Sequence, residues 1–132
     1  MIGLDTNVLV RYITQDDPQQ CAKVDALFEN QLSQENSAVI SKIVLCELTW
    51  VLSHAYRYSR EQIALVIQQM LITQEFVIED SENAIKALQD YQVGKAGFAD
   101  YFLAQTHLSM GAKHTVSFNK KALQSNLFQS VE

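Results

Sequence analysis

Proline and glycine are scarce in this chain of 132 residues, which contains one proline and four glycines. This scarcity argues against a disordered or low-complexity chain, and an apolar fraction of 48% is ordinary for a globular protein. The length fits one domain with a real core. We therefore expect residues 1–132 to form a single domain.

Long apolar runs and a secretory leader are also missing. No stretch approaches the ~18 uncharged apolar residues of a membrane-spanning helix. The N-terminus lacks a basic segment and reaches Asp5 almost at once, unlike a signal peptide. With only Cys21 and Cys46, the chain is expected to be cytoplasmic, to hold free thiols and not to bind membranes. The sequence alone leaves a disulfide between the two cysteines open.

Basic charge is the next shortage, because ten Lys and Arg stand against fifteen Asp and Glu, for a net charge of −5. A passive nucleic-acid binder usually has a basic face. If the substrate is a polyanion, bound divalent cations, a local basic cluster or a basic partner chain must offset the repulsion.

Several chemical motifs are absent as well. There is no glycine-rich phosphate loop and no nucleophile elbow. Two lone cysteines and three histidines without ligand spacing exclude a structural zinc site; the histidines are His54, His107 and His114.

What the chain does contain is an alternation of short β-like runs and longer helical periods. The pattern predicts strands over residues 1–4, 37–40, 76–78 and 114–118, with a last edge strand from 127–128. It predicts helices over 7–13, from Pro18 to about Leu32, 42–56, from Ser59 to about Leu71, from Asp80 or Ser81 to about Tyr91, 99–111 and 120–124. Strands separated by helices indicate an α/β domain with a mainly parallel sheet.

Residues typical of helix ends support these boundaries. Asp17 is a suitable N-cap with Pro18 at the first helical position, and Ser59 with Gln62 forms a capping box. Gly111 is typical of the position after a helix end.

Three acidic residues stand in apolar surroundings. Asp5 ends the first strand, Glu47 interrupts an apolar helix, and Asp100 lies in a run of Phe, Ala, Tyr and Leu. Ionised carboxylates are rarely buried unless they are paired, hydrogen-bonded or bound to a metal, so three of them suggest one cation site.

Each acid also has an ordinary explanation. Asp5 fits a helix N-cap, Asp100 fits the first turn of a helix, and Glu47 fits the solvent edge of an apolar stripe. Taken together they favour a hard divalent cation such as Mg²⁺ or Mn²⁺. The carboxyl ends of parallel strands share one crevice, where we expect Asp5 and residues 117–119 to lie. Such a site suits phosphoryl chemistry.

The same residues resemble the PIN-domain ribonucleases, specifically VapC-type toxins of toxin–antitoxin pairs. The resemblance covers nearly the whole chain and is carried by Asp5-Thr6-Asn7 after the first strand, by Glu47 in its helix, and by Phe98-Ala99-Asp100. It implies a three-layer α/β/α sandwich and a Mg²⁺- or Mn²⁺-dependent endoribonuclease. Asp5, Glu47 and Asp100 would be catalytic, Asp5 and Asp100 would ligate the metal, and Thr6 would orient Asp5. An RNA substrate, an inhibitory antitoxin with a basic tail and a homodimer are the partners it implies.

One position departs from the family pattern. The family commonly has a further acid after the fourth strand, where this chain has Ser117-Phe118-Asn119. The carbonyl of Asn119 can still accept a hydrogen bond from a metal-bound water. Because one negative charge is lost, we expect a single tightly held metal.

Candidates for RNA contact are dispersed along the chain. The basic ones are Arg11, Arg57, Arg60, Lys95, Lys120 and Lys121, and the aromatic ones are Tyr12, Tyr56, Tyr58 and Tyr101. Two readings compete with a ribonuclease. One is a catalytically weakened PIN-like binding or scaffold module, favoured by Asn119, and the other is a different α/β phosphotransfer or phosphatase-like enzyme.

Overall fold

A computed structural model describes residues 1–131 of the chain. They fall into two compact units, Met1–Glu79 and Asp80–Glu132. Each unit has its own sheet and its own helices, and each is described here by itself.

The first unit contains a three-stranded parallel sheet in the order β1-β2-β3. The strands are β1 (Ile2–Gly3), β2 (Ala38–Ile40) and β3 (Phe76–Ile78). Ile2 pairs with Ala38 in the first ladder, and Ile40 pairs with Ile78 in the second. Parallel neighbours require a crossover between them, so each pair of strands is separated by a pair of helices.

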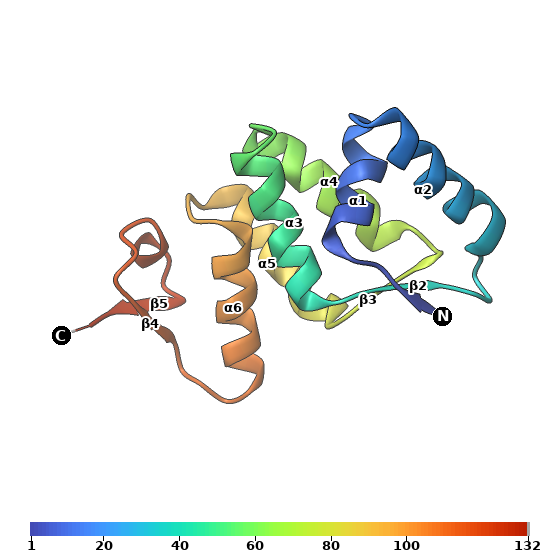
Figure 1. Ribbon diagram of the computed structural model, residues 1–132. Helices are drawn as coiled ribbons and strands as arrows, with labels where there is room; N and C mark the ends of the chain where they lie inside the picture. The colour runs from blue at the N-terminus through green and yellow to red at the C-terminus, as the bar shows by residue number, and fades with distance from the viewer. Residues whose placement is uncertain (132) are drawn as a thin grey trace. The chain divides into compact units, whose positions relative to one another are not determined.

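Four helices make these two crossovers. The first crossover holds α1 (Thr6–Thr14) and α2 (Pro18–Gln31), and the second holds α3 (Lys42–His54) and α4 (Arg60–Ile72). Both crossovers step in the same direction along the sheet, and such connections are nearly always right-handed. The helices of this unit therefore gather on one side of the strands (Figure 1).

Local sequence signals define the helix starts as expected. Asp17 accepts a hydrogen bond from the backbone of Gln20, with Pro18 next in line, and Ser59 and Gln62 form both bonds of a capping box. Ser41 caps α3 directly after β2 by accepting from Val44. The predicted starts at Pro18, Lys42 and Arg60 are thus confirmed, while α3 ends at His54, two residues before its predicted end.

The core of the first unit is aliphatic. It is formed where α1 packs on α2 and α3 and where α3 packs on α4. Its fully buried side chains include Leu9, Val10, Ile40, Leu45, Leu48, Leu52 and Ile67. Each such side chain contributes roughly 1.5–3 kcal/mol on transfer from water.

A polar network fixes the end of α1 against the end of α3. The Tyr56 hydroxyl donates to Asp16 Oδ2 at 2.6 Å, and Arg11 Nη1 donates to the Tyr56 hydroxyl at 3.2 Å and to Asp16 Oδ1 at 3.4 Å. The hydrogen bond from Tyr56 is the main cause that lowers the pKa of Asp16, and Thr14 and Arg11 act in the same direction.

The second unit pairs two helices with a two-stranded parallel sheet. Its elements are α5 (Ser81–Val93), α6 (Phe98–Ser109), β4 (Thr115–Ser117), the short 3-10 helix η1 (Ala122–Gln124) and β5 (Phe128–Ser130). The two helices pack closely on each other, and the rings of Tyr91 and Phe102 both meet Phe98 edge-on at their contact.

Two glycines shape the ends of these helices. Gly111 has φ +102°, and the backbone N–H groups of Gly111 and Ala112 donate to Leu108 and His107, which closes α6 as a Schellman motif. A Cβ on Gly94 would lie 1.8 Å from the hydroxyl oxygen of the buried Tyr101. Gly94 is therefore required for the close packing of α5 on α6.

The observed elements confirm the α/β class with parallel strands and are consistent with the expected α/β/α fold. In the described residues, however, β4 pairs with β5 in a sheet of its own instead of extending β1–β3. A single domain over 1–132 stays a prediction. Both cysteines are free thiols, as expected. None of the helices in residues 1–131 has the length and apolar character that crossing a bilayer demands.

The network around Asp16 predicts a pH dependence. Since folding lowers the pKa of Asp16, its contribution to stability is present above its ordinary pKa of 3.8 and is lost as the pH falls through the lower folded value. Asp16→Asn should therefore be less stable than the wild type at neutral pH, and the difference in the free energy of unfolding should shrink in acid. Urea unfolding of both proteins, from neutral pH to below pH 3.8, measures this difference in the free energy of unfolding. Glu35→Gln, which changes an exposed acid, should show no such trend, and a pH-independent difference for Asp16→Asn would contradict the assignment.

Candidate active site

Asp5 stands between β1 and α1, at the carboxyl end of the strand. It is the N-cap of α1, and its Oδ1 accepts a hydrogen bond from the backbone N–H of Thr6 at 2.7 Å. No protein donor in the described residues bonds its second oxygen, Oδ2. The residue is exposed, so one carboxylate oxygen is fixed by the helix start and the other is left without a protein donor.

Asp100 repeats this arrangement in the second unit. It lies in the first turn of α6, and its Oδ2 accepts from the backbone N–H of Gly97 at 3.0 Å. The side chain is half-buried, and within the described residues its Oδ1 has no protein donor. Like Asp5, it has one oxygen held at a helix start and one oxygen available.

Glu47 lies on the exposed side of α3. The buried stripe of this helix consists of Leu45, Leu48, Thr49 and Leu52. Glu47 projects away from that stripe, beside Ile43, which is itself 71% exposed. No hydrogen bond or ion pair to its carboxylate is found in residues 1–131.

The apolar sequence neighbours of these acids do not bury them, since Asp5 and Glu47 are exposed and Asp100 is half-buried. Apolar neighbours in sequence do not bury a helical residue, because successive side chains are turned by about 100° around the axis. The ordinary explanations for Asp5 and Asp100, as helix-start residues, describe real hydrogen bonds. They leave one oxygen of each carboxylate for another role.

Asp5 and Glu47 belong to the first unit, where α1 packs on α3, and Asp100 belongs to the second. Over residues 1–131 no group of three or more His, Cys, Asp or Glu side chains is close enough to hold a metal ion. One site built from Asp5, Glu47 and Asp100 stays a prediction.

Thr6 is the most unusual polar group beside these acids. Its side chain is 95% buried, and among the described residues its Oγ1 is the one buried side-chain polar atom without a hydrogen-bond partner. Burying a hydroxyl without a partner costs roughly 1–3 kcal/mol. An unsatisfied hydroxyl next to Asp5 fits a site whose remaining ligands come from outside the protein.

Asn119 has a structural role that sequence reasoning did not anticipate. Its Oδ1 accepts from the backbone N–H groups of Lys121 and Ala122, at 3.0 and 3.3 Å, and its own N–H donates to Ser117 Oγ. Both lone pairs of the amide oxygen are thus used by the turn before η1. The expected hydrogen bond from a metal-bound water to this oxygen is disfavoured, and the number of metals stays a prediction.

Some of the candidates for RNA contact are held by other side chains or buried, and others are exposed. Arg11 is held by Asp16 and Tyr56, Tyr101 is in the core, and the ring of Tyr12 packs against that of Phe28 in a tilted arrangement with centroids 4.3 Å apart. The exposed cations include Arg57, Lys120 and Lys121. His107 bonds Thr115 at 2.8 Å, which fits a structural histidine.

Sequence reasoning missed one exposed aromatic residue. Trp50 stands in the apolar run around Glu47, yet it is 62% exposed. Its spacing of three residues from Glu47 and four from His54 was the signal that could have placed all three on one helical face.

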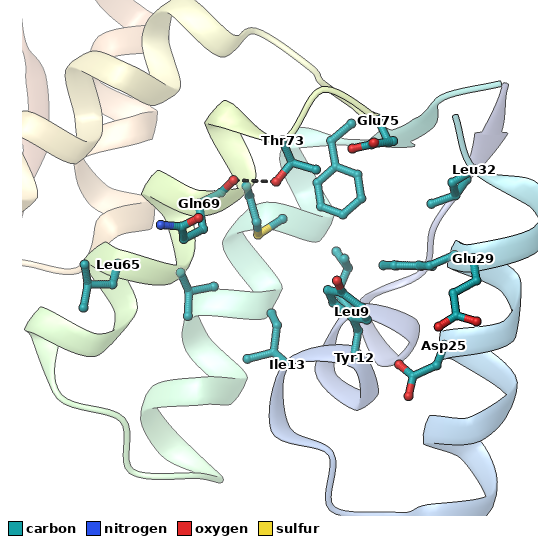
Figure 2. A pocket seen from close by; sticks show the side chains of 14 residues that line it. Leu9, Tyr12, Ile13, Asp25, Glu29, Leu32, Leu65, Gln69, Thr73 and Glu75 are labelled. Atoms are coloured by element: carbon teal, nitrogen blue, oxygen red, sulfur yellow. Dashed lines mark hydrogen bonds between the residues drawn. The ribbon is translucent and has the colours of Figure 1, made fainter. Parts of the chain in front are cut away.

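A second feature of the first unit is an apolar groove of about 710 Å³ between α1, α2, α4 and β3. Leu9, Tyr12 and Ile13 line it from α1, and Leu65 and Gln69 from α4 (Figure 2). Three acids stand along it, namely Asp25, Glu29 and Glu75. Neither Asp5 nor Glu47 is among its lining residues.

Comparisons with known proteins agree with the sequence motifs. A family model described as PIN domain matches residues 2–125. A VapC ribonuclease of Aquifex aeolicus (strain VF5) is 25% identical over 118 residues, which are 89% of this chain and 87% of that protein. No solved structure was found to match.

The two functions of Asp5 can be separated by mutation. Asp5→Ala removes the cap of α1 and should lower the free energy of unfolding by about 1 kcal/mol, because a helix N–H loses its acceptor. Asp5→Asn keeps an oxygen acceptor and should unfold like the wild type. Urea unfolding in EDTA measures both, since the chelator removes any metal contribution. Equal stability of Asp5→Ala and the wild type would contradict the capping role.

Proposed function

Because this chain belongs to the PIN-domain family, we propose that it is a metal-dependent endoribonuclease and the toxin of a toxin–antitoxin pair. The observation that carries the proposal is the hydrogen bonding of the two aspartate carboxylates. Asp5 and Asp100 each present one oxygen fixed by a backbone N–H and one oxygen that no protein group in residues 1–131 bonds. The printed name of the relative, a VapC ribonuclease, supports RNA as the substrate.

The donor set suits Mg²⁺ or Mn²⁺. These ions take carboxylate oxygens and water, and Mg²⁺ usually binds through one or two carboxylates while substrate phosphates complete its shell. Asp5 and Asp100 would hold the ion, which when bound lowers the pKa of a water and stabilises a leaving oxygen. The assignment of both residues to one ion comes from the family motifs.

The protein's own groups have separate tasks in the reaction. Glu47 accepts the proton of the attacking water on its exposed carboxylate. The Thr6 N–H holds Asp5 Oδ1 and so directs Oδ2 outward.

RNA cleavage tests this assignment. Glu47→Gln should lower the rate by roughly 10²- to 10⁴-fold, the usual contribution of a general base. Asp5→Asn and Asp100→Asn should be similarly impaired, although both keep an oxygen for the backbone N–H, and EDTA should abolish cleavage. Single-turnover cleavage of total RNA with Mg²⁺ or Mn²⁺ measures these effects.

The matched control is Glu35→Gln, which removes an exposed acid far from the motifs in sequence and should cleave like the wild type. Equal activity of all the acid variants would disprove the catalytic assignment. No cleavage by the wild type on any RNA would favour a binding module instead, the reading that Asn119 supports.

The groove between α1, α2 and α4 supports the partner part of the proposal. Its floor is apolar, and Asp25, Glu29 and Glu75 stand along it. An apolar segment with basic side chains would bury its apolar face there and pair with these acids. Such a segment matches the basic tail expected of an antitoxin.

Groove substitutions should separate inhibition from catalysis. Leu65→Asp places a charge in the groove and should prevent binding of the antitoxin, which we expect a small adjacent reading frame to encode. Co-expression of that antitoxin should then no longer rescue growth, while RNA cleavage by the variant stays unchanged. Ile85→Asp is the control, because Ile85 on α5 is similarly exposed (46% against 58% for Leu65). Growth of cells that express each variant together with the antitoxin measures the rescue. Normal rescue of cells that express Leu65→Asp would contradict the groove as the antitoxin-binding site.

A further inference from the structure

One face of α3 is exposed although it carries two large apolar side chains. Ile43, Glu47, Trp50 and His54 lie on this face, within about 60° of one another around the helix axis. Ile43 is 71% exposed and Trp50 is 62% exposed. All four residues belong to the first unit, so the face is defined by a single helix.

Trp50 and His54 form a stacked pair on this face. Their ring centroids are 4.5 Å apart and their planes differ by 18°. His54 Nδ1 lies 3.0 Å from the backbone carbonyl oxygen of Trp50, and since a carbonyl only accepts, this nitrogen donates. The hydrogen bond fixes the imidazole parallel to the indole, so the two rings are ordered before any ligand arrives.

The pair stands directly beside the proposed general base. Trp50 follows Glu47 by three residues, which is about 4.5 Å along the helix axis. Arg57, an exposed cation, follows His54 by three residues beyond the end of α3. In chain order, a carboxylate is thus followed by two stacked rings and then by an exposed positive charge.

This order of groups fits a nucleic-acid strand better than a protein partner. A protein partner that covers this face would enclose Glu47, which forms no ion pair within the described residues, and would itself have to supply a cation, because buried unpaired charges are strongly unfavourable. An unpaired base needs only a flat ring to stack on, and aromatic side chains bind the bases of single-stranded RNA in this way.

We infer that Trp50, held by His54, is the stacking platform for an unpaired base next to the scissile phosphate. The inference rests on the proposed function, since it assumes an RNA substrate, and it adds a residue that positions this substrate. Trp50 binds the base and Glu47 acts on the neighbouring phosphate, so loss of the ring affects substrate binding more than the chemical step.

The single tryptophan of the chain allows a direct test. Its emission should be quenched in a saturable way by a short oligouridine in EDTA, where cleavage is prevented. An abasic oligomer of the same length and charge should quench little. Quenching that is equal for both oligomers, or absent for both, would overturn the platform.

Cleavage kinetics provide the second test. Trp50→Ala should raise KM roughly 5- to 150-fold, the range for loss of one stacked base, with kcat nearly unchanged. Trp50→Phe should restore most of the lost affinity. Ile43→Ala is the matched control, because it removes an equally exposed apolar side chain from the same face and should leave KM unchanged.

The outcomes distinguish this inference from the proposed function. If the wild type cleaves RNA and Trp50→Ala has the same KM, only the platform is wrong. If the wild type neither binds nor cleaves RNA, the proposed function is wrong as well. If Trp50 is shielded from acrylamide in the free protein and Trp50→Ala dissociates a dimer in sedimentation, the face is an interface between two copies and the platform is overturned.

Discussion

The parallel pairing of β1 with β2 is the constraint on which the rest of the first unit depends. Parallel neighbours cannot be joined by a tight turn. Each strand is therefore followed by helices that return the chain to the end of the sheet at which the strands begin. Asp5 and Ser41, the residues that follow β1 and β2, consequently become the N-caps of α1 and α3. The position of Asp5 at the start of α1 is a consequence of this pairing, and the packing of α3 on α1 and α4 decides which side of α3 is left exposed.

A helix start also resolves an apparent conflict between two roles for the same acid. A capping carboxylate and a metal ligand look like alternatives only if both oxygens are needed for each role. The backbone N–H of Thr6 uses one oxygen of Asp5, and that of Gly97 uses one oxygen of Asp100. The cap restricts the rotation of the side chain, and such prior ordering lowers the entropic cost of binding a ligand at the second oxygen.

The helices could be predicted from local sequence signals. The pairing of distant strands could not. The residues at the helix ends act through hydrogen bonds to near neighbours, so their effect can be predicted from the sequence. They are Asp17 with Pro18, Ser59 with Gln62, and Gly111. The pairing of β4 with β5 depends on contacts that no local pattern encodes. The exposure of Glu47 and Trp50 could not be predicted for a related reason: an apolar run shows which residues are apolar but not which of them a neighbouring helix covers.

The negative charge of the chain, finally, limits how it can bind RNA. Proteins that rely on phosphate contacts gain affinity by releasing counterions, and this requires many free cations. Here Arg11 is held within the Asp16–Tyr56 network, and the net charge is −5. Under the proposed function, affinity would then come from terms that do not depend on basic charge, namely a divalent cation held by the acids and a base stacked on an exposed ring. The second of these terms would act on the exposed face of α3, where Trp50 follows Glu47 by three residues.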